Sequence, residues 1–158
     1  MKVRSATTDK PNTLGHLNME RMSVHDLNPA DYNPRTITSK ARAGLSRSLD
    51  LYGLVQPIIY NKRTTNVVGG HQRLSDLKDK GVVDTDVVVI DIPLEQEKEL
   101  NITLNNKNVS GDFTPELQAI LSELDADVKQ GLMMEPLVVM DTKEDFTFDD
   151  DNIGGVDT

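Results

Sequence analysis

The sequence predicts a small α/β domain of about 110 residues, spanning roughly residues 21–130. Short apolar stretches typical of strands alternate with segments whose apolar residues recur at helical spacing. Glycine or proline separates most of these segments. Only 37% of the 158 residues are hydrophobic, so part of the chain is expected to stay outside the core. We therefore expect a flexible N-terminal segment at 1–20 and an acidic, disordered tail at 131–158.

The first third of this domain is expected to hold a strand, a loop and a helix. Residues 22–27 alternate in polarity like a short strand, with Met22 and Val24 facing inward. Two Asn-Pro pairs, at 28–29 and 33–34, then predict a loop, because a residue before proline avoids the helical region. A helix is expected over 39–52, where apolar residues recur at helical spacing. Its N-terminal cap is Thr38 or Ser39, and its C-terminal residue is Gly53.

The middle of the chain predicts two strands that flank a polar turn, followed by a helix. Residues 55–60 are an apolar run in which Pro57 indicates an edge strand or the start of a strand. A second strand is expected at 66–68, after the turn. The two glycines that follow lead into a helix over about 72–80, which Gly81 ends.

The second half begins with residues 87–92, which are nearly all apolar and predict a strand buried on both faces. Pro93 opens a helix with glutamates in its first turns, where the helix dipole favours them. Residues 105–111 are a polar break. Thr114-Pro115 then starts an amphipathic helix whose apolar stripe is Leu117, Ile120, Leu121 and Leu124. Past Gly131, only 137–140 are expected to be ordered.

Charge is distributed unevenly along the chain, whose net charge is −9. Residues 1–80 carry 13 Lys/Arg against 7 Asp/Glu, a net of +6. Residues 81–134 carry 3 against 11, and residues 135–158 carry 1 against 8. The first half is therefore the part expected to contact a polyanion, although an ordinary solvated surface is the alternative.

Composition excludes several classes of protein. The chain has no cysteine, which rules out a disulfide framework, a thiolate zinc site and a catalytic thiol, and which fits a cytoplasmic protein. No apolar run approaches the roughly 20 residues of a membrane span, so no membrane association is expected.

The segment Gly69-Gly-His-Gln-Arg73 is the clearest candidate site. A strand that turns sharply into a helix exposes unpaired backbone N–H groups, which attract anions. Glycine allows positive φ and leaves room for a close oxygen atom, and Arg73 could form charged hydrogen bonds to that oxygen. His71 and Gln72 add donors. The alternative is a tight connection that needs glycine only for its geometry.

Four segments in order resemble the ParB/sulfiredoxin-like superfamily, in particular the phage-type or methyltransferase-associated ParB N-terminal-like domains that are also named ParB-like nucleases. The segments are Asn33-Pro-Arg35, Tyr52-Gly-Leu-Val-Gln-Pro57, Gly69-Gly-His-Gln-Arg73 and Leu104-Asn-Asn-Lys-Asn108. The resemblance covers about residues 21–125. It implies a ParB/sulfiredoxin-like fold, with a mixed sheet and flanking helices.

In ParB-type domains the last two segments hold a nucleoside triphosphate and its metal, so the resemblance implies a nucleotide or phosphate site here, with Mg²⁺ as a cofactor bound through the nucleotide. Asn105 stands where relatives carry a glutamate, and an amide is a poorer magnesium ligand than a carboxylate. Binding without fast hydrolysis is therefore the favoured expectation. The residues expected at this site are Gly69, Gly70, His71, Gln72, Arg73, Gln56, Asn105, Asn106 and Arg35.

Two functions remain open from the sequence. The first is a phosphate-binding module that acts in DNA transactions, is encoded by a phage or mobile element, and forms a homodimer or binds a DNA-processing protein. The second is an enzyme of the same fold, an NTPase or weak metal-dependent nuclease, with His71 as the catalytic base and Arg73 on the phosphate. Sulfiredoxin activity is excluded because that enzyme needs a cysteine. Contacts to a DNA backbone are expected from Lys40, Arg42, Arg47, Lys62 and Arg63.

Overall fold

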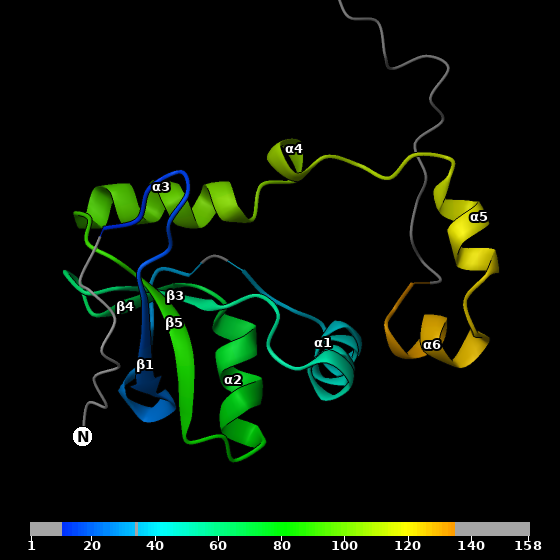
Figure 1. The fold of residues 1–158 in the computed structure, drawn as a ribbon, viewed down its shortest axis with the longest axis horizontal. Helices are drawn as coiled ribbons and strands as arrows, with labels where there is room; N and C mark the ends of the chain where they lie inside the picture. Colours follow the sequence, from blue (N-terminus) through cyan, green and yellow to red (C-terminus); the bar gives the residue numbers. More distant parts are fainter. Residues whose placement is uncertain (1–10, 34, 135–158) are drawn as a thin grey trace, which may run out of the picture.

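The computed structural model describes residues 11–33 and 35–134. Its centre is a mixed five-stranded sheet in the order β1-β5-β3-β4-β2 (Figure 1). The strands are β1 Met19–Ser23, β2 Asn28–Pro29, β3 Ile58–Asn61, β4 Asn66–Gly69 and β5 Asp84–Ile90. β5 pairs antiparallel with β1 and parallel with β3, while β4 pairs antiparallel with β3 and parallel with β2. The expected α/β class, with a mixed sheet and flanking helices, is confirmed.

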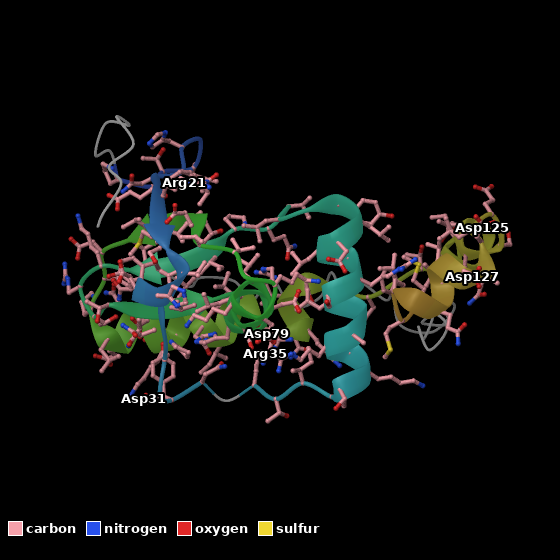
Figure 2. All side chains as sticks on the ribbon, turned by 90° about the horizontal axis from the view of Figure 1, so that it is seen from below. Arg21, Asp31, Arg35, Asp79, Asp125 and Asp127 are labelled. Atoms are coloured by element: carbon pink, nitrogen blue, oxygen red, sulfur yellow. The ribbon has the colours of Figure 1, made fainter. Side chains whose placement is uncertain are left out.

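Helices lie on both faces of the sheet and beyond one end of it. Figure 1 shows α2 against one face and α3 along the other, while α5 and α6 lie on the far side of α1, as Figure 2 also shows. No helix in the described part of the chain is long and apolar enough to cross a membrane. The helices are η1 Val24–Asp26 (a 3₁₀ turn), α1 Ser39–Tyr52, α2 His71–Asp79, α3 Leu94–Leu104, α4 Lys107–Ser110, α5 Leu117–Ser122 and α6 Ala126–Gly131.

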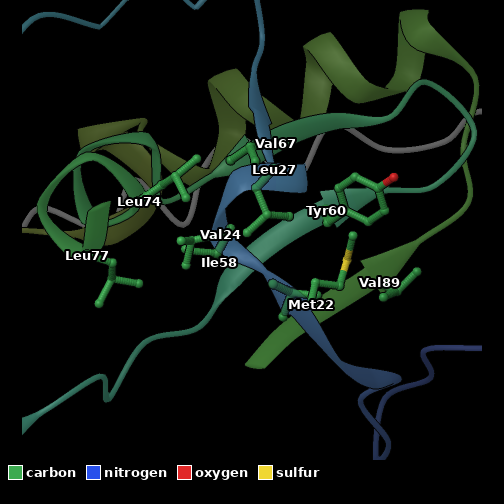
Figure 3. Close-up of a cluster of buried hydrophobic side chains, with 10 residues drawn as sticks. Met22, Val24, Leu27, Ile58, Tyr60, Val67, Leu74, Leu77 and Val89 are labelled. Carbon is green, nitrogen blue, oxygen red and sulfur yellow. The ribbon is translucent and has the colours of Figure 1, made fainter. Parts of the chain in front are cut away.

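The face of the sheet toward α2 carries the hydrophobic core (Figure 3). Alternate residues of the strands point to this face, because side chains along a strand alternate between the two faces. Each fully buried aliphatic side chain contributes roughly 1.5–3 kcal/mol to stability. The cluster consists of Met22, Val24, Leu27, Ile58, Tyr60, Val67, Leu74, Leu77, Val87 and Val89.

The opposite face, toward α3, is partly polar. Glu97, Asn101 and Asn105 follow one another at four-residue spacing along α3 and its C-terminal cap. Glu97 and Asn101 are 0% and 1% exposed. We name these three residues the polar stripe of α3. From the sequence, Glu97 was expected only to interact favourably with the helix dipole. In the structure it is buried and surrounded by hydrogen-bond donors.

The expected helix over 39–52 is confirmed with its ends. The Thr38 hydroxyl accepts a hydrogen bond from the backbone N–H of Ala41 at 3.1 Å, and Gly53 has a φ of 72°. Not every apolar residue of this helix is covered, because Tyr52 is 62% exposed. β3 begins at Ile58, directly after the proline that predicted a strand start.

The expected strand over 22–27 is wrong in its extent. β1 ends at Ser23, whose side chain accepts a hydrogen bond from the N–H of His25 and so begins the 3₁₀ turn. Met22 and Val24 are nevertheless both buried, as expected. The Asn28-Pro29 pair, expected in a loop, forms the two-residue strand β2 beside β4.

The second half differs from expectation at two places. A short helix, α4, interrupts the expected polar break, because the Asn106 side chain caps it by accepting from the N–H of Asn108. Of the expected apolar stripe, Leu117 is buried and Leu121 and Leu124 are half-buried, but Ile120 is 57% exposed, so the stripe is only partly covered. Residues 137–140, most of the expected tail at 131–158 and residues 1–10 of the expected N-terminal segment lie outside the described residues.

Candidate phosphate-binding cleft

The turn from β4 into α2 has the geometry expected of an anion site. Gly70 lies at the N-terminal cap of α2 with a φ of 87°, a left-handed conformation that favours glycine. A Cβ atom on Gly70 would lie 3.1 Å from Ile58 Cγ1 and 3.3 Å from Arg73 Nη2, so a side chain there would crowd the arginine. No side chain in the described ranges caps this end of the helix. The first N–H groups of α2 therefore have no intrahelical partner and are available to an anion.

A cleft of about 750 Å³ opens at this turn. Its walls come from the connection between β2 and α1, from α1, from β3 and its preceding loop, from the β4–α2 turn, and from the end of α3 with α4. Eight of the nine residues expected at the phosphate site line it: Arg35, Gln56, Gly69, Gly70, His71, Gln72, Arg73 and Asn105. The four segments that carry the family resemblance thus meet around one cavity.

Asn106 is the expected residue that does not line the cleft. Its side chain is used as the cap of α4 instead, at 3.0 Å from the N–H of Asn108. Lys107 and Ser110 line the cleft in its place, and Asn33 lines it from the opposite wall. Asn33 and Lys107 lie within two of the segments that carry the family resemblance, so that signal could have identified them.

Two arginines reach the cleft without a carboxylate partner in the described part of the chain. Arg73 Nη1 donates to Gln56 Oε1 at 3.2 Å, and Arg35 Nη1 donates to Asn105 Oδ1 at 2.6 Å. The Nε atom of Arg73 is buried and has no hydrogen-bond partner among the described residues. Burial lowers the pKa of Arg73, and the positive charge of Arg35 lowers it further. An anion between the two guanidinium groups would offset both causes of the lowered pKa of Arg73.

The cleft carries no negative charge within the described part of the chain. Lys107 is a third cation in its lining, and neither an aspartate nor a glutamate lines it. Its remaining walls are largely apolar and include Ile59, Val88 and Leu104. In residues 11–33 and 35–134, no group of three or more His, Asp or Glu side chains could hold a metal ion. The cleft is therefore suited to an anionic group attached to a less polar body.

The imidazole of His71 is hydrogen-bonded to backbone groups. Its Nε2 atom accepts a hydrogen bond from the N–H of Ala30 at 3.2 Å. Burial lowers the pKa of His71, the charge of Arg35 lowers it further, and a hydrogen bond to the Val67 backbone acts in the opposite direction. We assign the proton to Nδ1, facing that backbone group, because Nε2 is an acceptor. A neutral imidazole with both nitrogens engaged holds the β2–α1 connection and is poorly placed to act as a base.

The five basic residues expected to follow a DNA backbone lie in two separate places. Figure 1 shows the β3–β4 turn, which carries Lys62 and Arg63, at the end of the sheet away from α1. Both residues lie beside Asp91, at 3.9 and 2.8 Å. On α1, Arg42 donates to Asp79 at 2.8 Å and to Ser75 at 2.6 Å, which joins α1 to α2.

The other two of these basic residues, Lys40 and Arg47, also lie on α1. Neither forms an ion pair among the described residues, and the side chain of Arg47 lies against Gly131 of α6. The five residues therefore do not form one continuous basic track in this structure.

Comparison with known proteins gives the fold. No family model matches the sequence, and no curated protein matches it. The structure is similar to that of the C-terminally truncated chromosome-partitioning protein ParB from Caulobacter crescentus complexed with CTP-γ-S, with a TM-score of 0.57 and 19% identity. That match covers 73% of this chain and 71% of the other. The chain therefore has a ParB-like fold, as the sequence resemblance implied.

Two further structures match more weakly. The Pnob8-like ParB-N domain matches with a TM-score of 0.48 and 22% identity, over 56% of this chain and 36% of the other. The Caulobacter crescentus ParB complexed to the centromeric parS site matches with a TM-score of 0.44 and 17% identity, over 72% and 65% of the two chains.

Proposed function

We propose that the protein is a nucleotide-binding module whose cleft holds the phosphate groups between the N-terminus of α2, Arg73 and Arg35. The observation that carries this proposal is the pair of guanidinium groups without an ion pair among the described residues, in a chain with a net charge of −9. Of the four described arginines outside the cleft, Arg21, Arg42 and Arg63 each have an aspartate partner, and Arg47 alone has none among the described residues. Arg73 is partly buried and Arg35 is exposed beside it, and a partly buried cation next to a second cation is costly unless an anion joins them.

The shape of the cleft supports a nucleotide rather than a DNA backbone as the ligand. A duplex backbone is bound by cations spread over an exposed surface, and Arg42, Lys62 and Arg63 are already used in ion pairs. The cleft instead combines clustered cations with apolar walls, which suits a phosphate group and the sugar or base attached to it. The CTP-γ-S complex of the similar ParB structure supports the same ligand class.

Magnesium and hydrolysis fit the cleft poorly. Mg²⁺ is usually held by carboxylates together with substrate phosphates, and no carboxylate lines this cleft within the described residues. We propose that any Mg²⁺ enters with the nucleotide and is held by its phosphates and by water. Because His71 is engaged on both ring nitrogens, binding without turnover is the favoured activity, and the NTPase or nuclease alternative has less support.

The wider role that we propose is in DNA transactions. The ParB-like fold and the four sequence segments support this role, and they also motivate the proposal of a phage or mobile-element origin and of a homodimer or DNA-processing partner. We propose that the nucleotide is the signal in such an assembly and that a partner makes the sequence-specific contacts to DNA.

The experiment is isothermal titration calorimetry of the full chain with CTP, ATP, GTP and UTP, with and without Mg²⁺, and with a short DNA duplex. We expect one nucleoside triphosphate to bind and Arg73→Ala to weaken its binding by about 10- to 100-fold, the loss of one charge-assisted contact of about 1.5–3 kcal/mol. Arg63→Ala is the matched control, because it removes the same charge at a distance from the cleft.

Three outcomes would count against parts of the proposal. If no triphosphate binds, the cleft is not a nucleotide site. If Arg73→Ala and Arg63→Ala weaken binding equally, attraction is due to overall charge and not to the cleft. If the duplex binds tightly and every nucleotide fails, the ligand is the DNA backbone.

A further inference from the structure

Glu97 is the most fully hydrogen-bonded buried acid in the described chain, and it lies outside the cleft. Four side chains donate to its two oxygens: Tyr32 Oη at 2.7 Å, Asn61 Nδ2 at 2.8 Å, Asn66 Nδ2 at 3.1 Å and Thr64 Oγ1. Burial raises the pKa of Glu97, but these hydrogen bonds together outweigh it, so its pKa lies below the ordinary value. Glu97 is therefore a buried carboxylate stabilised by neutral donors and not by a cation.

Three of these donors belong to one hairpin, whereas the fourth belongs to the β2–α1 connection, of which Asn33, Arg35 and Ile37 line the cleft. Asn61, Thr64 and Asn66 lie on the β3–β4 hairpin. Tyr32 lies in the connection between β2 and α1, whose described residues are 30–33 and 35–38. The same connection carries Arg35 into the cleft. Glu97 thus links the hairpin and α3 to the segment that carries one of the two guanidinium groups.

The β2–α1 connection is attached to the rest of the fold at three points. The N–H of Ala30 donates to His71, the hydroxyl of Tyr32 donates to Glu97, and the guanidinium of Arg35 donates to Asn105. The ammonium group of Lys98 also lies 5.4 Å from the centre of the Tyr32 ring. These attachments fix a segment that has only a two-residue strand, β2, before it.

Two of the three attachments come from the polar stripe of α3. Asn105 Nδ2 donates to the Asn101 carbonyl at 2.7 Å, and Asn101 Nδ2 donates to the Val68 carbonyl at 2.9 Å. These bonds orient the Asn105 amide so that its oxygen faces Arg35. The stripe is therefore anchored to β4 at its middle, while its two ends hold Tyr32 and Arg35.

We propose that Glu97 is a positioning residue for the cleft, which acts through the Tyr32 hydroxyl to hold Arg35 where it meets the phosphate. This inference rests on the proposed function and adds a residue that does not contact the ligand. Asn105 is the second positioning contact, because its oxygen accepts from Arg35 directly. Immobilising a flexible side chain before binding saves about 0.5–1.5 kcal/mol, which corresponds to roughly 2- to 12-fold in affinity.

The test is a double-mutant cycle between Tyr32 and Arg35, measured as the dissociation constant of CTP and, as a second probe, of inorganic tripolyphosphate. Tyr32→Phe removes the hydroxyl and keeps the ring. We expect it to weaken binding by about fivefold in the natural chain and to have no further effect when Arg35→Ala is already present, because there is then no guanidinium to position. Asn105→Ala, at an exposed position, provides a second variant with the same expected dependence on Arg35.

Thr64→Val is the matched control. It removes a different donor from the same carboxylate without touching the β2–α1 connection, so we expect it to lower the free energy of unfolding about as much as Tyr32→Phe and to leave affinity within about twofold, because the connection keeps its attachments. An equal loss of affinity in Thr64→Val would overturn the positioning role, because binding would then follow general stability.

The outcomes separate this inference from the proposed function. If Arg35→Ala binds both probes as the natural chain does, the cleft assignment itself fails. If Arg35→Ala weakens binding while the effect of Tyr32→Phe is absent, or is unchanged in the Arg35→Ala background, the cleft stands and the positioning role fails.

Discussion

The two faces of the sheet are built on opposite principles. The face toward α2 is closed by aliphatic side chains, and its buried residues include Leu27, Ile58 and Leu74. The face toward α3 holds a buried carboxylate and a row of amides, and at one end it opens into the cleft. The first face gains stability from the loss of apolar surface to water. The second face uses directional hydrogen bonds, which fix side chains at particular positions.

Because of this difference, we expect substitutions on the two faces to affect stability and ligand binding differently. A substitution in the core lowers stability but leaves the hydrogen bonds around the cleft in place. A substitution in the polar stripe changes both, because Glu97, Asn101 and Asn105 support the fold and also hold the residues that we propose bind the ligand.

Leu27→Ala tests the face toward α2. Leu27 is 0% exposed, so its removal leaves a cavity and should lower the free energy of unfolding by about 3 kcal/mol. Urea denaturation followed by circular dichroism measures this. The affinity of the remaining folded protein for CTP should be unchanged. A large change in affinity at low temperature, where the variant is folded, would show that the two faces are not independent.

Glu97→Gln tests the centre of the polar stripe. The amide keeps the shape of the side chain but places its own N–H donors against other donors. We therefore expect the free energy of unfolding to fall by about 2 kcal/mol at pH 7. The pKa of Glu97 is lowered in the folded state, so its contribution to stability is present above the unfolded pKa near 4.5 and is lost as pH falls through the folded pKa. The difference between the two proteins should therefore shrink below about pH 4.5. Urea titrations at pH 7, 5 and 3 measure it, and a constant difference would contradict this account of Glu97.

His71→Leu tests the attachment of Ala30. The N–H of Ala30 would be left without its acceptor, which should cost about 1 kcal/mol at pH 7.5. The pKa of His71 is lowered in the folded state, so the natural chain is stabilised above the unfolded pKa near 6.5 and loses stability as pH falls below it. The difference in free energy of unfolding between the natural chain and His71→Leu should therefore narrow from pH 7.5 to 5.5. A parallel assay for phosphate release and DNA cleavage distinguishes the enzymatic alternative, which requires that such activity be present and depend on His71.

Arg63→Ala tests the end of the sheet away from α1. The side chains of Arg63 and Asp91 are about half exposed, so this ion pair is worth about 0–1 kcal/mol. We expect only a small change in the free energy of unfolding and no change in CTP affinity. A marked loss of affinity for a DNA duplex alone would indicate that the β3–β4 turn contacts nucleic acid.

Much of the local structure could be predicted from the sequence because local signals decide it. The helix over 39–52 has its cap residue, its spacing and its closing glycine within one continuous segment. The turn at Gly69-Gly70 could be predicted for the same reason, since only glycine easily adopts the conformation that the turn requires. The extent of β1 and the exposure of Ile120 were mispredicted, because a polarity pattern cannot say which other element will cover a face.

The α/β class, the sites of the turns and the concentration of positive charge before residue 80 follow from the sequence alone, because spacing and residue type are local properties. The sequence also brought together most residues of the cleft, through ordered segments that resemble a family. Which arginines form ion pairs, by contrast, depends on the folded chain. Arg42 and Arg63 are paired with aspartates that lie far away in the chain, whereas Arg35 and Arg73 meet no carboxylate among the described residues. Likewise, only folding turned Glu97 inward, because four donors from two distant segments, the β2–α1 connection and the β3–β4 hairpin, converge where α3 crosses the sheet.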